Sequence, residues 1–416
     1  MNKKTYVKLI IYSIILYTLL NIAHPITPSY VLQRNLDTWV FGLFFALMSL
    51  GTLLTAPVWG AYGDKHGRRR TLLIGTVMYA VAQIFFGIFT GIIGISIARF
   101  VAGLFSSAMK VGILSYITGS KKLQKFNKGK LISYYVSATL IGSSLGSFIG
   151  GQLGTFFTDR YQFVLFIQAA LLIVLGIIAF IVFPMDDEAP SKKIRKNSFS
   201  SFKEIGNLSP WYAIFFVLIS SLSIVFVSVP KFVDVYFSDQ NLSTSALGNF
   251  GLVSGLLVLL TNLFVTPYII KKFGALRGSY ITGILGAIAL GITFSAGNFL
   301  GAIYSIYFVY YLASTINQTS TTYFLSNNKE MDKGVLFGFN ESFKSLGAII
   351  GPFLGGFLYE YNSKLFFYVC ASILFISEII LFILAKQKNK HQNTIIEDDD
   401  KEFEFNGFKE NIKKSE

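Results

Sequence analysis

Long apolar runs recur along the whole chain of 416 residues. Each is long enough to cross a membrane as a helix, which takes about 20 residues at about 1.5 Å per residue. Only 14% of the residues are charged, against about 25% in a typical soluble domain. Because backbone polar groups in lipid must be satisfied within their own segment, the runs predict transmembrane helices. Twelve spans are predicted, at 7–25, 39–60, 71–90, 92–116, 131–156, 161–183, 211–233, 247–269, 279–297, 299–325, 335–359 and 364–386.

Lys and Arg residues gather in alternate connecting segments. These segments are 1–8, 61–70, 119–130, 184–210, 271–277, 326–334 and 386–390. The segments of the opposite side contain only Arg34, Arg160, Lys231 and Lys364. Since basic loops stay on the cytoplasmic side, we expect a multi-pass protein of the cell membrane with both termini in the cytoplasm. The net charge of +14 lies in short clusters without an aromatic-basic platform, so no nucleic-acid partner is predicted.

The fifth and eleventh predicted spans share a run of glycines at one constant offset. The runs are Gly142, Gly146, Gly150 and Gly151, and Gly347, Gly351, Gly355 and Gly356. Glycines four residues apart line one face of a helix and allow close packing. The basic loop at 271–277 also echoes the loop at 61–70 at nearly the same offset. The repeat predicts two pseudo-symmetric six-helix bundles, a construction found in secondary transporters.

The longest polar segment inside the chain divides the predicted spans into six and six. The prediction is therefore an all-α membrane protein with an N-terminal bundle at 1–183, a cytoplasmic linker at 184–210 and a C-terminal bundle at 211–386. The remaining residues, 387–416, are highly charged and lack apolar periodicity. They are predicted to form a disordered cytoplasmic tail.

Several motifs resemble one family. The loop after the second span has the pattern G-x-x-x-D-x-x-G-R, formed by Gly60, Asp64, Gly67 and Arg68. The fourth span contains R-x-x-x-G from Arg99 to Gly103, and the first ends in P-x-x-P from Pro25 to Pro28. The eleventh contains G-x-x-x-G-P-x-x-G-G with Pro352, whereas the fifth has Ser147 in place of the proline. Together they resemble the major facilitator superfamily, and within it the twelve-span drug:proton antiporters.

The resemblance implies efflux of small amphipathic molecules by proton antiport and alternating access. The implied partners are a small-molecule substrate, protons and the lipid bilayer, and a monomer without cofactor or metal is expected. It implies a gate at Asp64, Gly60, Gly67 and Arg68, and a proton-coupling role for Arg99. It also implies helix packing at Gly142, Gly146, Gly150, Gly347, Gly351, Pro352 and Gly355.

The ionisable residues inside the spans are candidates for function, since a charge at the bilayer centre costs about 2.5–3.5 kcal/mol. Glu341 is the predicted proton carrier, and Lys344 lies three residues further on the same helix face. Lys110 is predicted to line a substrate cavity with Tyr311, Asn317 and Gln318 of the polar tenth span. Four other residues are given no central role: Glu378 in a peripheral span, Lys231 and Asp234 at a rim, and His24 at the interface.

Other functions stay open at this point. Proton-coupled uptake and dedicated export of a single metabolite would use the same architecture. A channel is disfavoured, because a duplicated bundle with a gate-like loop suits alternating access. The sequence contains no H-E-x-x-H or G-x-S-x-G motif and no paired-cysteine site, which argues against a membrane enzyme, and no G-x-x-x-x-G-K-[ST], which argues against ATP-driven transport.

Overall fold

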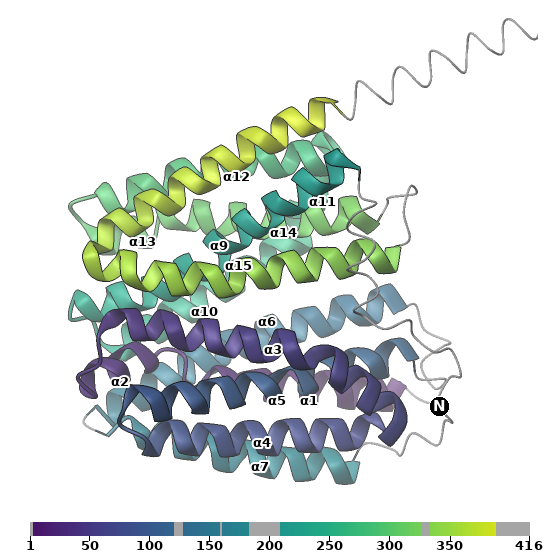
Figure 1. Cartoon of the computed structure of the whole chain (residues 1–416), viewed down its shortest axis with the longest axis vertical. Helices are drawn as coiled ribbons and strands as arrows, with labels where there is room; N and C mark the ends of the chain where they lie inside the picture. Colours follow the sequence, from purple (N-terminus) through teal and green to yellow (C-terminus); the bar gives the residue numbers. More distant parts are fainter. Residues whose placement is uncertain (1–2, 120–127, 159, 183–208, 327–332, 388–416) are drawn as a thin grey trace, which may run out of the picture.

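The computed structural model describes residues 3–119, 128–158, 160–182, 209–326 and 333–387. These residues are almost entirely helical and include no strand. Figure 1 shows long helices lying side by side in one bundle, with the purple and blue helices of the first half below the teal, green and yellow helices of the second. The predicted all-α membrane fold is confirmed.

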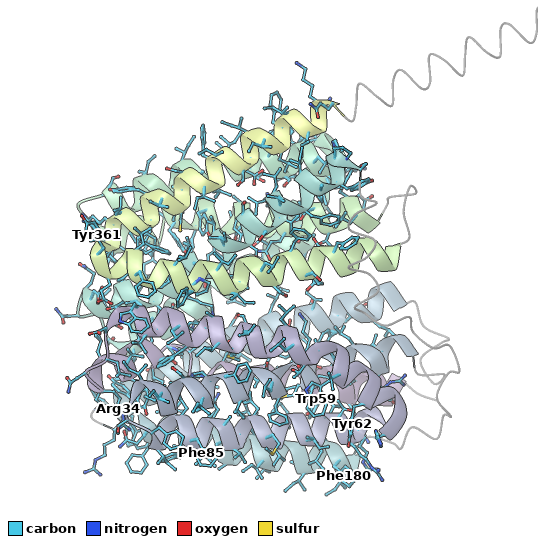
Figure 2. The ribbon with its side chains drawn as sticks, viewed as in Figure 1. Arg34, Trp59, Tyr62, Phe85, Phe180 and Tyr361 are labelled. Atoms are coloured by element: carbon cyan, nitrogen blue, oxygen red, sulfur yellow. The ribbon has the colours of Figure 1, made fainter. Side chains whose placement is uncertain are left out.

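The described residues of the first half form six long helices and one short one. They are α1 Lys3–Asn21, α2 Thr27–Gln33, α3 Thr38–His66, α4 Arg68–Ile88, α5 Ile92–Gly119, α6 Lys128–Phe156 and α7 Gln162–Val182. The short helix α2 lies at one end of the bundle, on the left of Figure 1. We call this the α2 end, and the opposite end, where Gly67 connects α3 to α4, the α3–α4 end. Figure 2 shows Arg34 and Tyr361 at the α2 end and Trp59, Tyr62 and Phe180 at the other.

The second half repeats this order with two interrupted spans. Its elements are α9 Pro210–Asp239, α10 Thr244–Leu260, the π-helix η3 Thr261–Val265, α11 Thr266–Phe273, α12 Ala275–Ser295, α13 Phe299–Ile303, α14 Ile306–Ser326 and α15 Lys333–Tyr361, followed by a final helix, Ser363–Gln387. Within the described ranges, nine helical segments are long and apolar enough to cross a membrane. The number of twelve spans stays a prediction, as do the proposed boundaries of the halves; nearly all of the 184–210 linker and the 387–416 tail lie outside the described residues.

Two glycines make corresponding sharp turns in the two halves. Gly67 joins α3 to α4 with a φ of 91°, and Gly274 joins α11 to α12 with a φ of 82°. Side chains are strained at such positive φ values, so glycine suits both positions. These turns set the ends of consecutive antiparallel helices at the α3–α4 end.

The glycine runs of α6 and α15 lie against the first long helix of their own halves. A Cβ atom added at Gly142 or Gly146 would overlap the backbone of α1, one added at Gly150 would overlap the backbone of Ile22 directly after α1, and one added at Gly347 or Gly351 would overlap the backbone of α9. These two contact lines, which we call the glycine seams, bring helix backbones together without intervening side chains. Close backbone approach of this kind stabilises helix pairs where lipid provides no hydrophobic driving force.

Two pairs of long helices join the halves, α3 with α15 and α6 with α10, and the short helix α2 also contacts α9. An added Cβ at Gly42 of α3 would overlap the carbonyl of Pro352 in α15, and Gly151 of α6 meets Gly248 of α10 in the same way. Near the α2 end, the Trp39 backbone N–H donates to Glu360 at 2.9 Å. The halves are therefore in backbone contact toward the α2 end, and this contact closes that side of the space between them.

Candidate functional site

A cavity of about 1070 Å³ lies between the two halves. At its inner limit it is lined by His24, Pro230 and Asp234, which lie near the α2 end. Toward the α3–α4 end it is lined by Val136 and Tyr323. Because the halves touch at the α2 end, the cavity extends from that closed end toward the opposite side. Its volume suits a drug-sized molecule.

A histidine and a carboxylate from opposite halves are in contact at the closed end of the cavity. The Nδ1 atom of His24, after α1, is 2.9 Å from Oδ2 of Asp234 in α9, and the two side chains are 34% and 9% exposed. Three residues before Asp234, the Lys231 ammonium lies 3.2 Å from the centre of the Phe45 ring of α3. Asp234 is the only acidic residue among the described residues that line the cavity.

The rest of the wall is polar and aromatic. Ser314, Thr315 and Gln318 of α14 line it, together with Ser143 and Ser147 of α6. The aromatic part comes from Phe226, Phe250 and Tyr311. Such a wall can solvate an apolar body by its rings and a polar group by its hydroxyls and amides. The arrangement fits amphipathic ligands more closely than a single rigid polar one.

The wall is interrupted by the π-helical turn in the eighth span. Pro267 follows this turn and has no N–H to donate to an α-helical bond. The wider turn brings Asn262 and Leu263 to the cavity wall, and the Thr319 hydroxyl of α14 donates to Asn262 Oδ1 at 2.9 Å. Short π-helical segments are frequent at functional sites.

Arg99 lies outside the cavity in a buried hydrogen-bond chain. Its Nη1 donates to Gln83 of α4 at 3.1 Å, and Gln83 donates to Gln168 of α7 at 2.7 Å. Gln168 in turn donates to the carbonyl of Leu19 at 2.7 Å. That carbonyl belongs to the last turn of α1 and also accepts a longer bond from the Ile22 N–H at 3.4 Å. The chain thus connects the Arg99 guanidinium to the end of the helix that precedes His24.

The other predicted site residues are placed as follows. Tyr311 and Gln318 line the cavity, while Lys110 and Asn317 are not among its lining residues. Glu341 forms an ion pair with Lys344 at 3.6 Å, and their side chains are 64% and 29% exposed; only Lys344 lines the cavity. Gly67 and Arg68 lie at the α3–α4 turn, whereas the side chain of Asp64 and the surroundings of Gly60 are outside the described part.

Two features of the structure were not predicted from the sequence. His24 and Asp234 were expected at an interface and a rim, yet they form a pair between the halves, in which Asp234 is buried and His24 is partly exposed. Glu378 was expected to be peripheral, yet it is fully buried and accepts a hydrogen bond from Asn317 at 2.5 Å. The available signal was the scarcity of acidic residues near the spans, which marks each of them as costly in lipid.

Comparison with known proteins gives a consistent result. The family profile of the Major Facilitator Superfamily matches residues 9–331. Multidrug resistance protein 2 of Bacillus subtilis is 23% identical over 379 residues, covering 88% of this chain and 91% of the relative. Quinolone resistance protein NorA of Staphylococcus aureus is 22% identical over 407 residues, covering 94% of this chain and 100% of the relative.

The fold is also similar to solved structures. A bacterial homolog of the human lysosomal transporter Spinster, in an inward-facing and unoccupied conformation, superimposes with a TM-score of 0.75. The identity is 14%, and the match covers 93% of this chain and 98% of that chain. At this identity the likeness shows a shared fold.

Proposed function

Because the chain belongs to the Major Facilitator Superfamily, and is thus a membrane transporter and not an enzyme, we propose that it exports small amphipathic molecules in exchange for protons. The observation that carries the proposal is the His24–Asp234 pair, which places one carboxylate in the cavity and ties the two halves together. The names of the relatives, which include multidrug and quinolone resistance proteins, support export of drug-like molecules.

We assign the exchanged proton to Asp234 ahead of Glu341. Asp234 is buried and lines the cavity, so a substrate and a proton can compete for its carboxylate. The Glu341 side chain is 64% exposed and paired along its own helix. A carboxylate that changes protonation inside a transport cavity also changes its contacts with the opposite half, which is what coupling requires.

The ion pair would act as a lock on the empty transporter. In the ion-paired form, His24 and Asp234 hold the α2 end closed. A proton on Asp234 neutralises the carboxylate, and a substrate seated against it displaces His24, so either one releases the lock. An exchanger needs this property, because an unloaded molecule that changed conformation freely would dissipate the proton gradient.

The proposed orientation places the α3–α4 end in the cytoplasm. This end carries Arg68, Arg69 and Arg70 in the first turn of α4, and Lys271 and Lys272 in the last turn of α11, and basic residues at span ends favour the cytoplasmic side. Both termini would then be cytoplasmic, and the cavity would extend toward the cytoplasm. A monomer suffices for this activity, because one chain provides the whole cavity wall.

The test is substrate-dependent proton movement in sealed vesicles that contain the purified protein. An imposed proton gradient should drive accumulation of amphipathic compounds, and addition of substrate should move protons in the opposite direction. A panel of cationic, neutral and anionic compounds would separate broad export from transport of a single metabolite. Proton and substrate moving in the same direction would replace the proposal by uptake, and substrate movement without protons would remove the coupling.

A further inference from the structure

Glu378 in the final helix is a buried carboxylate outside the cavity. Its residue is 0% exposed, and Oε1 accepts a hydrogen bond from Asn317 Nδ2 at 2.5 Å. Among the described residues, Oε2 has no hydrogen-bond partner, and no Lys, Arg or His pairs with this carboxylate. A buried carboxylate with a single neutral donor is strongly unfavourable unless a cation neutralises it.

Three helices enclose this carboxylate. Asn317 belongs to α14, and a Cβ added at Gly283 of α12 would overlap the Glu378 carboxyl group. One turn further along the final helix, the Phe382 ring packs on Tyr280 of α12 with 5.2 Å between ring centres. The carboxylate therefore lies within an interface of α12, α14 and the final helix, separated from the cavity.

Two further oxygen atoms in this interface also lack partners. Ser279 of α12 and Ser320 of α14 are both fully buried, and neither hydroxyl has a hydrogen-bond partner within the part of the chain that the structure describes. Gly286 packs against Ala313, which sets the register of these antiparallel helices. Ser279 is about one turn before Gly283 on α12, and Ser320 is about one turn after Asn317 on α14, on the basis of 3.6 residues per turn.

We propose that this interface is a second site for a small monovalent cation, either a proton or Na⁺, bound to Glu378 with Asn317, Ser279 and Ser320 beside it. Carboxylate, amide and hydroxyl oxygens are the ligands that hard cations take. A single carboxylate matches a single positive charge. Unsatisfied buried polar atoms that cluster together are a recognised indication of a missing ion or water.

The site is linked to the transport cavity through one helix, α14. Asn317 holds Glu378 on one side of α14, while Ser314 and Gln318 of the same helix line the cavity. A cation between α12, α14 and the final helix would fix α14 and hence this part of the wall. The site is separate from the exchange assigned to Asp234, so its existence can be tested without substrate.

The test uses the full-length protein in lipid nanodiscs, without substrate. Thermal unfolding is followed by tryptophan fluorescence in NaCl and in choline chloride at equal ionic strength, and infrared spectra record the carbonyl band of protonated carboxyl groups. The variants are Glu378→Gln, which keeps the side-chain volume and the acceptor for Asn317, and the double change Ser279→Ala with Ser320→Ala. Asp37→Asn, an exposed acid at the α2 end, is the matched control.

If Na⁺ occupies the site, NaCl should raise the Tm by roughly 2–4 °C. Glu378→Gln should abolish the shift, the double serine variant should weaken Na⁺ binding, and Asp37→Asn should keep the response. If a proton occupies it, the infrared band should be present in the native protein, absent in Glu378→Gln and retained in the double serine variant, with no effect of NaCl. A native protein with neither a Na⁺ response nor a protonated carboxyl band that depends on Glu378 would overturn the inference, whatever the outcome of transport assays.

Discussion

His24 and Asp234 lie 2.9 Å apart and connect the end of the first span to the last two turns of α9, the seventh span. The pair lies at the closed end of the cavity, so it belongs both to the ligand site and to the contact between the halves. Substituting one residue of the pair at a time can therefore separate the two roles. Removing the acid should abolish coupling, whereas removing the histidine should abolish the lock.

Asp234→Asn should eliminate proton-driven accumulation and leave passive substrate exchange. The substitution keeps the shape of the side chain and removes the group that exchanges the proton. Substrate affinity should change by about tenfold or less, equivalent to about 1.4 kcal/mol. Parallel measurement of uphill and downhill flux in vesicles checks this. Asp239→Asn, on the same helix but bonded to the Tyr359 hydroxyl, is the control, and unimpaired uphill transport by Asp234→Asn would refute the assignment.

His24→Gln should produce a leak. Glutamine cannot hold the Asp234 carboxylate by charge, so the empty transporter should change conformation more readily. Proton flux without substrate should rise above that of the native protein, while substrate-linked flux should persist. A pH-sensitive dye trapped in the vesicles measures both quantities. A variant as tight to protons as the native protein would show that the ion pair has no locking role.

Glu341→Gln tests the competing proton carrier. Because the Glu341–Lys344 pair is largely exposed, its loss should reduce the free energy of unfolding by only about 0–1 kcal/mol. Under our assignment to Asp234, uphill transport should continue. If a well-folded Glu341→Gln protein loses proton-driven accumulation, Glu341 carries the proton as its position in the sequence first suggested. The double change with Lys344→Gln then shows whether an unpaired lysine was responsible.

Gly42→Ala should weaken the seal between the halves. The added methyl group would overlap the Pro352 carbonyl, and such overpacking typically costs about 1–3 kcal/mol. The equilibrium should shift toward opening at the α2 end. A cysteine at Ser143 in the cavity should then react faster with a membrane-impermeant reagent added outside; the native Cys370 is buried. Gly291→Ala, in a helix with open space at its Cβ, should leave the reaction rate unchanged.

Gln83→Leu should destabilise the protein through Arg99. The substitution removes the acceptor for the Arg99 guanidinium and the donor to Gln168. Leaving buried polar groups unsatisfied costs about 1–3 kcal/mol for each group, and more for a charged one. Thermal unfolding should show a lower Tm, and Gln83→Glu, which restores an acceptor, should recover part of it. Equal stability of Gln83→Leu and the native protein would mean that Arg99 has another partner of equal strength.

Helix positions could be predicted well because lipid imposes a simple rule on length and polarity. The predicted span at 279–297 falls on α12, Ala275–Ser295. The span at 247–269 was located but its internal form was not, because the π-helical turn before Pro267 depends on local backbone bonding that hydropathy does not report. The turns at Gly67 and Gly274 fall in the two basic loops that sequence comparison of the halves had paired.

The partners of the charged residues could not be predicted in the same way. His24 and Asp234 meet only because the two halves pack together, with α2 against α9 at this end, and each alone looks like an ordinary residue near a span end. Glu378 finds Asn317 for the same reason. Glu341 shows the converse. Its depth along the span could be predicted from the sequence, but the exposure of its side chain depends on neighbouring helices. Hydropathy indicates that a charge in lipid is unfavourable, and helix packing decides which partners stabilise it.

The glycine seams have a consequence for how this chain can evolve. At Gly142, Gly146, Gly347 and Gly351 the neighbouring backbone leaves room only for hydrogen, so drift at these positions is nearly forbidden. Side chains in the cavity wall point into open space, and exchanging them alters what fits there with little effect on the scaffold. Substitutions are therefore expected to be tolerated in the cavity wall and not in the glycine seams. Proteins with this construction can diverge until they share about a fifth of their residues, as this chain and its relatives do. Their substrates can change while the packing of the helices stays the same.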